Sequence, residues 1–417
     1  MKITKKFIEI SGVSTKKQRT DSFFIHGWLQ ILTRYGLFKE TIRKFLLALR
    51  KQKPGLYENI KGHLSKAYLE KDFDLTEKDH EKAKRRILSM AKDMHKLIVS
   101  FENHKQVKNY ETFKILQQVF KEQCEIKNDS ENKSNQIIIK DKPDKKAINS
   151  PHNKQVQYRR KGKQEARGDL GFVTETSDPS NKVQFITDAK VTQITKHDSK
   201  EQPQIQKRLK ENDLLPEKQY ADSGFVNGKT IKESKKNDVE LEGPTAGTSQ
   251  SFEEYESKSR PLDAGDFDTT YNSESGELVV NKCPNNQEPI KQYKSKKTGK
   301  LNVYFNRKIC NACSLKGRCS VQIGKRVSTY SVSEEEYIGA IRHHKYMNDR
   351  QYRKECSVRA GAEALVSELV RAHGMRKSRH RERKRTELQL IFASLACNVK
   401  RFIKYWENSV HFEPELA

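Results

Sequence analysis

The spacing of apolar residues changes several times along the chain, and each change marks a different kind of element. Apolar residues recur every three or four positions from Phe23 to about Cys124, as in "FFIHGWLQILTRYGLFKETIRKFLLALRKQ", and again from about Glu334. This spacing predicts amphipathic helices, because it gathers apolar side chains on one helical face. The clearest case is "TELQLIFASLACNVKRFIKYW", with apolar positions 388, 391, 395, 399, 402 and 406.

Between these blocks the pattern favours strands. The segment "GFVTETSDPSNKVQFITDAKVTQIT" (171–195) is rich in Val, Thr, Phe and Ile and has a turn composition at its centre, which predicts a hairpin. We expect a short helix in "QIQKRLKENDLLP" and a strand running into a turn in "EKQYADSGF". Short strands follow at 279–330, around a group of cysteines. Together these elements predict a mixed α/β core.

Two polar stretches, 127–169 and 257–277, interrupt this pattern and are expected to separate folded units. The predicted segments are a first core strand in 1–22, a helical insertion in 23–126, a polar and mobile linker in 127–168, core strands in 169–245, a cysteine-bearing insertion in 246–332 and C-terminal helices in 333–417.

The charge of the chain points to a polyanionic partner. Its 417 residues include 82 Lys and Arg but only 55 Asp and Glu, a formal net charge of +27. The sequence contains no apolar run near the roughly 20 residues that a membrane span needs, and "MKITKKFIEI" lacks a secretory apolar region. We therefore expect a cytoplasmic, nucleoid-associated protein that binds nucleic acid and not a membrane.

Four cysteines have the spacing of a metal site. A Cys-x-x-Cys turn presents two thiolates to one ion, and two more cysteines complete tetrahedral zinc coordination. A redox pair or unrelated buried thiols are the alternatives, although the polar, basic surroundings suit thiolates better than inert buried thiols. Cys124, Cys356 and Cys397 lie in helical patterns and are expected in the core. The candidate zinc ligands are Cys283, Cys310, Cys313 and Cys319.

The stretch "RAGAEALVSELVRAHGMRKSRHRERKR" (359–385) combines an apolar helical stripe with a dense basic run. On a helix, Arg359 and Glu363 lie at the margin of the stripe. They form either an i,i+4 surface ion pair, worth tenths of a kcal/mol, or a metal-binding carboxylate beside a nucleic-acid track. The basic run at 376–385 is either a solvated helix face or a phosphate-binding surface.

Several phrases occur in an order that resembles one family. They are "KKQRTDSFFIHGWLQILTRYGLFKETIRKFLLAL", "TETSDPSNKVQFITDAKVT", "LLPEKQYADSGFVNGKTI", "CP…CNACSLKGRC" and "RAGAEALVSELVRAHGMRKSRHRERKRTELQLIFASLACNVKRF". The chain is similar over about residues 15–406 to the DDE transposases of bacterial insertion sequences, in the group of insertion sequence eleven-eighty-two, whose members carry a cysteine-bearing insertion. The similarity is most specific over 353–406.

The resemblance implies a ribonuclease-H-like fold in which three carboxylates hold two Mg²⁺ ions, with Mn²⁺ able to substitute. The matching positions are Asp21 in "RTDS", Asp222 in "YADSGF" and Glu363 in "RAGAE". Two hard cations about 3.5–4 Å apart can activate the attacking oxygen and stabilise the leaving oxygen when one phosphodiester is exchanged for another. Arg359, one turn before Glu363, would orient that carboxylate or contact a phosphate.

Each position also has a simpler explanation. Asp21 precedes an apolar-periodic run, where aspartate is a favoured helix N-cap, and Asp222 precedes Ser-Gly, an ordinary turn composition. Asp178, Asp188 and Asp198 are rival acids that we expect in turns or on the surface.

The expected partners are DNA, at element ends and at the target, and a second copy of the chain in a homodimer. We expect DNA contacts from Arg359, Arg371, Arg376, Lys377, Arg379 and Arg381.

Two departures from the family keep other functions open. Family members usually have a long helical segment before the first aspartate, whereas Asp21 follows only 20 residues, and Phe23 stands where a small hydroxyl residue is usual after "DS". The alternatives to an active transposase are a truncated, catalytically inactive remnant that only binds DNA, and a zinc-containing nucleic-acid-binding protein.

Overall fold

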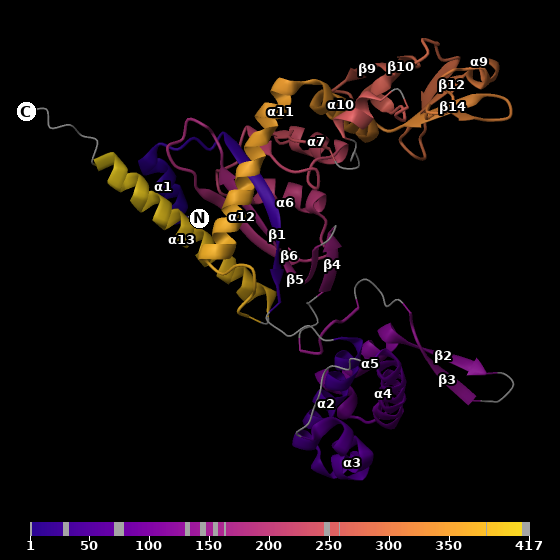
Figure 1. Cartoon of the computed structure of the whole chain (residues 1–417), viewed down its shortest axis with the longest axis vertical. Coiled ribbons are helices and arrows are strands. Elements are labelled where there is room, and N and C mark those ends of the chain that lie inside the picture. Colours follow the sequence, from indigo (N-terminus) through magenta and orange to yellow (C-terminus); the bar gives the residue numbers. More distant parts are fainter. Residues whose placement is uncertain are drawn as a thin grey trace, which may run out of the picture.

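A computed structural model gives the structure of the chain (Figure 1). It describes residues 2–27, 33–70, 79–129, 134–141, 147–152, 157–161, 164–245, 251–257, 259–380 and 382–410. Within these ranges, no helix combines the length and the apolar character that a membrane span requires.

The centre of the molecule is a mixed sheet to which the described residues contribute six strands. Strand β1 pairs antiparallel with β5 on one side and parallel with β7 on the other, and β8 continues the sheet parallel to β7. Strands β4 and β6 both pair antiparallel with β5. The strands are β1 (Lys17–His26), β4 (Gln157–Lys161), β5 (Gln164–Thr176), β6 (Ile186–Gln193), β7 (Lys218–Tyr220) and β8 (Glu240–Glu242).

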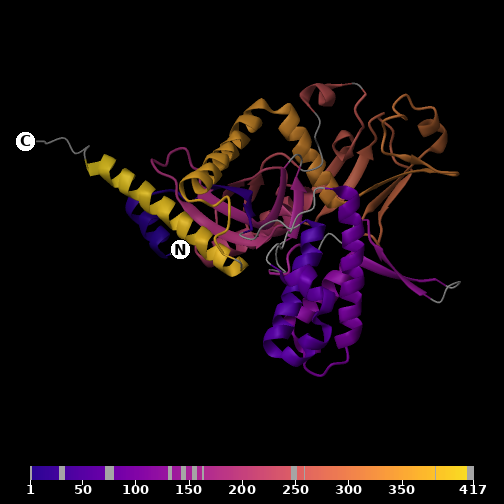
Figure 2. The same ribbon diagram turned by 60° about the horizontal axis from the view of Figure 1, so that its bottom comes forward.

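Helices cover both faces of this sheet. Successive side chains of β1 point to opposite faces, so neighbouring residues of this strand pack against different helices. Phe24 packs in a core with Ile205 of α6 (Asp198–Glu211) and with Phe225, which precedes α7 (Gly228–Lys235). Phe23 and Ile25 pack on the other face, against α12 (Gly361–Ala372) and α13 (Arg383–Val410). Helix α1 (Lys2–Ser11) lies beside α13 (Figure 2).

The chain between β1 and β5 forms a helical bundle with its own core. Phe38, Phe45 and Phe113 are fully buried there. Side chains of Thr33 and Asp79 cap the first turns of two of the helices. The bundle and its hairpin lie at one end of the molecule (Figure 1) and comprise α2 (Arg34–Gln52), α3 (Pro54–Leu69), α4 (His80–Phe101), η1 (Val107–Asn109), α5 (Glu111–Gln123), β2 (Cys124–Asp129) and β3 (Ser134–Ile139).

A small β-rich unit with a separate core lies between β8 and the C-terminal helices (Figure 1). The elements of the unit are α8 (Phe252–Glu256), η2 (Ala264–Asp266), β9 (Asp268–Asn272), β10 (Glu277–Lys282), β11 (Lys291–Lys294), β12 (Leu301–Phe305), α9 (Arg307–Asn311), β13 (Gln322–Ile323) and β14 (Ser328–Val332). Helix α10 (Glu334–Asn348) leads from this unit back to the sheet and packs against α7. It is followed by α11 (Arg350–Cys356) and η3 (Ser357–Ala360).

Several expectations are confirmed, and others are wrong. The hairpin after residue 170 is β5–β6, the short helix is α6, and the last helix is α13. The first segment begins with a helix, α1, and its strand does not end at residue 22. Residues 23–26 still belong to β1 and are not helical. Part of the predicted mobile linker forms the hairpin β2–β3 and strand β4.

Candidate active site and cysteine cluster

Asp21 and Asp222 come from neighbouring parallel strands. The pairing of β1 with β7 matches Arg19 to Tyr220, and both aspartates lie two positions beyond this pair. Strand β7 ends at Tyr220, so Asp222 lies just after the strand, near the level of Asp21. Because side chains alternate, Asp21 lies on the same face as Phe23, the face that α12 covers.

Asp222 also closes the turn that follows β7. Its Oδ1 accepts a hydrogen bond of 2.8 Å from the backbone N–H of Gly224. Its backbone oxygen accepts bonds of 3.1 and 3.2 Å from the N–H groups of Phe225 and Val226. The carboxylate is half-buried. Asp222 therefore forms part of a turn, as its Ser-Gly context predicted, and also lies just after the end of a strand.

Asp21 does not cap a helix, because it lies inside β1. One of its carboxylate oxygens accepts a 2.7 Å hydrogen bond from the N–H of Ser22. The N-cap explanation is wrong because the apolar residues after Asp21 are buried on both faces of a strand.

Glu363 lies in the first turn of α12, with its side chain exposed at the edge of the face that packs on β1. Ala362 and Leu365 fill the packed face. Among the described residues, Glu363 makes neither a hydrogen bond nor an ion pair, so the surface pair with Arg359 does not form. Arg359 is half-buried in η3.

One acidic residue near this site was assigned wrongly from the sequence. Asp198 begins α6 and is only 1% exposed, so it is not a surface residue. Its Oδ1 accepts a 3.2 Å hydrogen bond from Ser22 Oγ. Its Oδ2 and the Oδ1 of Asp222 lie 2.7 and 3.0 Å from the position that a Cβ on Gly224 would take, so the two carboxylates are neighbours. The predicted helix began at Gln204, six residues after Asp198, so the sequence pattern gave no signal for this acid.

The two other rival acids lie elsewhere. Asp188 is 8% exposed in β6 and is ion-paired with Arg208 at 2.7 Å, so the surface assignment is wrong. Burial raises the pKa of Asp188, while the hydrogen bonds and charge of Arg208 oppose that rise. Asp178 occupies a turn as expected and accepts a hydrogen bond from the backbone N–H of Ser180, which lowers its pKa.

The basic run does not lie on a helix. Helix α12 ends before Gly374, which has a left-handed φ of +67°, and Met375 is buried in the core under α13. The next residues run beside the end of β1. The N–H of His26 donates to the oxygen of Arg376 at 2.9 Å, and the N–H of Ser378 donates to the oxygen of His26 at 2.8 Å.

This pairing leaves the basic side chains free to face solvent. Arg371, Arg376, Lys377 and Arg379 are exposed, whereas Arg381 lies outside the described residues. Burial, and then the charges of Arg376 and Lys377, lower the pKa of His26. The helix-face explanation of the run is therefore wrong, while phosphate contact stays a prediction.

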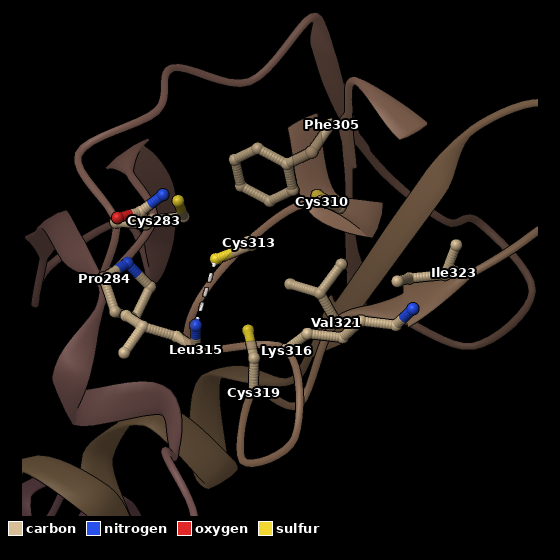
Figure 3. A pocket seen from close by; sticks show the side chains of 11 residues that line it. Cys283, Pro284, Phe305, Cys310, Cys313, Leu315, Lys316, Cys319, Val321 and Ile323 are labelled. Atoms are coloured by element: carbon tan, nitrogen blue, oxygen red, sulfur yellow. Dashed lines mark hydrogen bonds between the residues drawn. The ribbon is translucent and has the colours of Figure 1, made fainter. Parts of the chain in front are cut away.

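The four cysteines line one pocket of about 30 Å³ (Figure 3). Cys283 follows β10, Cys310 lies in α9, and the other two lie in the turns after α9. The Sγ of Cys313 accepts a hydrogen bond from the N–H of Leu315 at 3.4 Å. Burial raises the pKa values of the Cys310 and Cys319 thiols.

The donor sets fit different metals. Carboxylates inside β1 and just after β7 suit a hard cation such as Mg²⁺, and four thiols around a pocket suit Zn²⁺. Closer groupings of ligand-type atoms, within 4.8 Å, occur in the described residues at Glu368–His373–Cys397 and Asp263–Asp266–His344. Their carboxylates are engaged: Glu368 pairs with Arg401, Asp266 with Arg260, and Asp263 with His344. The remaining cysteines, Cys124, Cys356 and Cys397, are buried as expected.

Comparison with known proteins places part of this chain in a class. Residues 282–403 match the family described as the transposase DDE domain. The matched part contains Glu363 and the four cysteines. No curated protein and no solved structure matches the chain. The family match supports a DDE transposase in general, and DNA is the substrate on which transposases act.

Proposed function

We propose that the chain is a metal-dependent DNA transposase of an insertion sequence, cutting DNA at element ends and joining it to a target. The observation that supports the proposal is the origin of the three acids: Asp21 lies in β1, Asp222 follows the parallel neighbour β7, and Glu363 lies in the helix that packs on β1. The strand order and directions, with β5 antiparallel to β1 and with β7 and β8 parallel to it, support a ribonuclease-H-like core.

In this proposal Asp21, Asp222 and Glu363 would hold two Mg²⁺ ions, which Mn²⁺ could replace. Bound there, the ions would supply a Lewis acid for the attacking and leaving oxygens of the phosphodiester. The role of the chain is to place the carboxylates. One comes from β1, the second from the turn after its hydrogen-bonded neighbour β7, and the third from a helix that packs on β1.

The other parts of the chain take supporting roles. Arg359, Arg371, Arg376, Lys377 and Arg379 would contact DNA phosphates beside the carboxylates. The four cysteines would hold one structural zinc that stabilises the small β-rich unit. We assign the chain to the group of insertion sequence eleven-eighty-two on the phrases quoted from its sequence. The homodimer stays a prediction.

A Glu363→Gln variant tests the proposal, because it keeps the size of the side chain and removes the charge that holds a cation. The substrate is a plasmid carrying the gene with its natural flanking DNA. We expect Mg²⁺-dependent cleavage to fall about 100-fold or more, since metal stabilisation is worth several kcal/mol and 1.36 kcal/mol is tenfold. Binding to the same DNA should persist.

The matched control is Glu81→Gln, an exposed glutamate in the first turn of α4. It should cleave like the unaltered protein. Equal cleavage by Glu363→Gln would exclude a catalytic role for this carboxylate. Binding without any cleavage by the unaltered protein would favour the inactive remnant.

A further inference from the structure

A buried ion-pair network joins the strand that carries Asp21 to the helix that carries Glu363. Glu175 of β5 lies directly opposite Arg19 of β1 and is only 1% exposed. Its Oε1 lies 2.8 Å from Nε and 2.7 Å from Nη2 of Arg19. Its Oε2 accepts a 2.8 Å hydrogen bond from Nη1 of Arg401 in α13. Both oxygens of one buried carboxylate therefore hold a guanidinium, which is a strongly directional arrangement.

Both arginines extend from Glu175 to the α12 region. Arg19 donates through Nη1 to the backbone oxygen of Val358 at 3.2 Å, just before the helix begins. Arg401 donates through Nη2 to Oε2 of Glu368, in the middle of α12, at 2.7 Å. The helix is thus tied to the sheet at two points along its length, and both ties lead to Glu175.

Gly361, two residues before Glu363, makes room for this network. A Cβ on Gly361 would lie 1.8 Å from Nη1 of Arg19 and 2.2 Å from its Cζ. Only glycine lets the guanidinium pass under the first turn of α12. The close approach of Arg19, from the distant strand β1, therefore explains the glycine in "RAGAE".

We propose that Glu175 is a positioning residue: through Arg19 and Arg401 it holds α12 so that Glu363 and Asp21 share one pair of divalent cations. This inference rests on the proposed function. Arg19 lies two residues before Asp21 on the same face of β1, so the network fixes one carboxylate relative to the other. A role limited to fold stability would leave the metal affinity of the folded protein unchanged.

Two variants disturb the network in different ways. Glu175→Gln removes the central charge and keeps the shape. Gly361→Ala changes no charge but forces the Arg19 guanidinium off Glu175, and the flexible arginine side chain can move without unfolding the strand. Gly55→Ala is the matched control, because Gly55 also lies in the first turn of a helix, α3, and a Cβ there meets nothing within 4 Å.

The measurement is Mn²⁺ binding to the full chain, with the free ion quantified by electron paramagnetic resonance. Thermal unfolding checks that each variant is folded. The relevant Mn²⁺ site is the one that no longer binds the ion in Glu363→Gln. We expect both variants to raise the dissociation constant of that site about 10- to 100-fold, as removal of the residues that orient metal ligands commonly does. Cleavage should need correspondingly more Mg²⁺, and Gly55→Ala should behave like the unaltered protein.

The outcomes separate the two claims. If the unaltered protein lacks a Mn²⁺ site that depends on Glu363, the proposed function is overturned and the role of Glu175 with it. If that site exists and folded Gly361→Ala binds Mn²⁺ as tightly as the unaltered protein, only the positioning role is overturned. Gly361→Ala also decides the matter if Glu175→Gln does not fold.

Discussion

At Gly224, two acidic side chains approach the same backbone position. A Cβ there would lie 2.7 Å from Oδ2 of Asp198 and 3.0 Å from Oδ1 of Asp222. Gly224→Ala should therefore push the Asp222 carboxylate out of place while leaving β7 intact. We expect Mg²⁺-dependent cleavage to fall about 10- to 100-fold, because small displacements of catalytic groups have effects of that size.

The control for this variant is Gly317→Ala, in open space within the β-rich unit, where a Cβ meets nothing within 4 Å. Circular dichroism should show both variants folded. Unchanged cleavage by Gly224→Ala would mean that the position of Asp222 does not limit the reaction.

Glu355 offers a prediction on pH. Its carboxylate accepts hydrogen bonds from Lys218 at 2.8 Å and from Tyr220 at 3.0 Å. The bond from Lys218 is the main cause that lowers the pKa of Glu355 from 4.5. The folded pKa is below the unfolded one, so this group stabilises the fold above the unfolded pKa and loses that contribution as pH falls through the folded pKa.

Glu355→Gln should therefore lower the melting temperature at neutral pH and flatten the loss of stability below about pH 4.5. Thermal unfolding between pH 3 and 7 measures this. If Glu355→Gln lost stability in acid as steeply as the unaltered protein, another carboxylate would control the loss of stability at low pH.

Single residues show where sequence reasoning reaches its limit. The position of Glu363 at the edge of a helix followed from local periodicity, because the residues that determine it lie within two turns. The burial of Asp198 and the steric need for Gly361 depend on partners far away in the sequence, such as Ser22 and Arg19. Local spacing carries no information about such contacts.

At the scale of elements, composition and a central turn predicted the hairpin β5–β6, although β5 is buried throughout residues 170–176. Periodicity predicted the helix α13, but Leu388 and Ile391 of the predicted apolar stripe are exposed. It failed at β1, where Phe23, Phe24 and Ile25 are all buried because helices cover both faces of the sheet. A strand buried on both sides reads as a continuous apolar run and resembles a helix segment.

The folding of the β-rich unit should depend on bound metal. Zinc with Zn–S distances of about 2.3 Å would draw together four sulfurs that line an open pocket. We expect purified protein to contain one zinc per chain, and Cys310→Ser to lose it. The sheet β11–β12–β14–β13 should then melt separately, because zinc binding in small domains contributes about 10–16 kcal/mol of folding free energy.

The control for the zinc prediction is Cys124→Ala, a buried thiol at the end of the helical bundle. It should keep the zinc. Metal analysis that finds no zinc in the unaltered protein would make the four cysteines ordinary thiols.

Across the whole molecule, the charge of +27 raises the question of where a polyanion binds. The segment after Gly374 runs along the end of β1, with Arg376, Lys377 and Arg379 exposed. Its backbone is held by hydrogen bonds, so these side chains are presented from a fixed support on the strand that carries Asp21. A DNA duplex lying on them would pass close to the candidate carboxylates.

Changing Arg376, Lys377 and Arg379 together to Ala should therefore weaken DNA binding with a characteristic salt dependence. Each phosphate contact contributes about 0.9 to the slope of log K against log salt on duplex DNA, so the slope should become shallower by about 3 units. Gel-shift titrations at several salt concentrations give this slope. The matched control changes Lys82, Arg85 and Lys92 of α4, which removes the same charge from the helical bundle. Because the two variants have equal net charge, a general electrostatic effect would alter both slopes alike, and that result would place the DNA elsewhere. A loss confined to the first variant would place it along the end of β1.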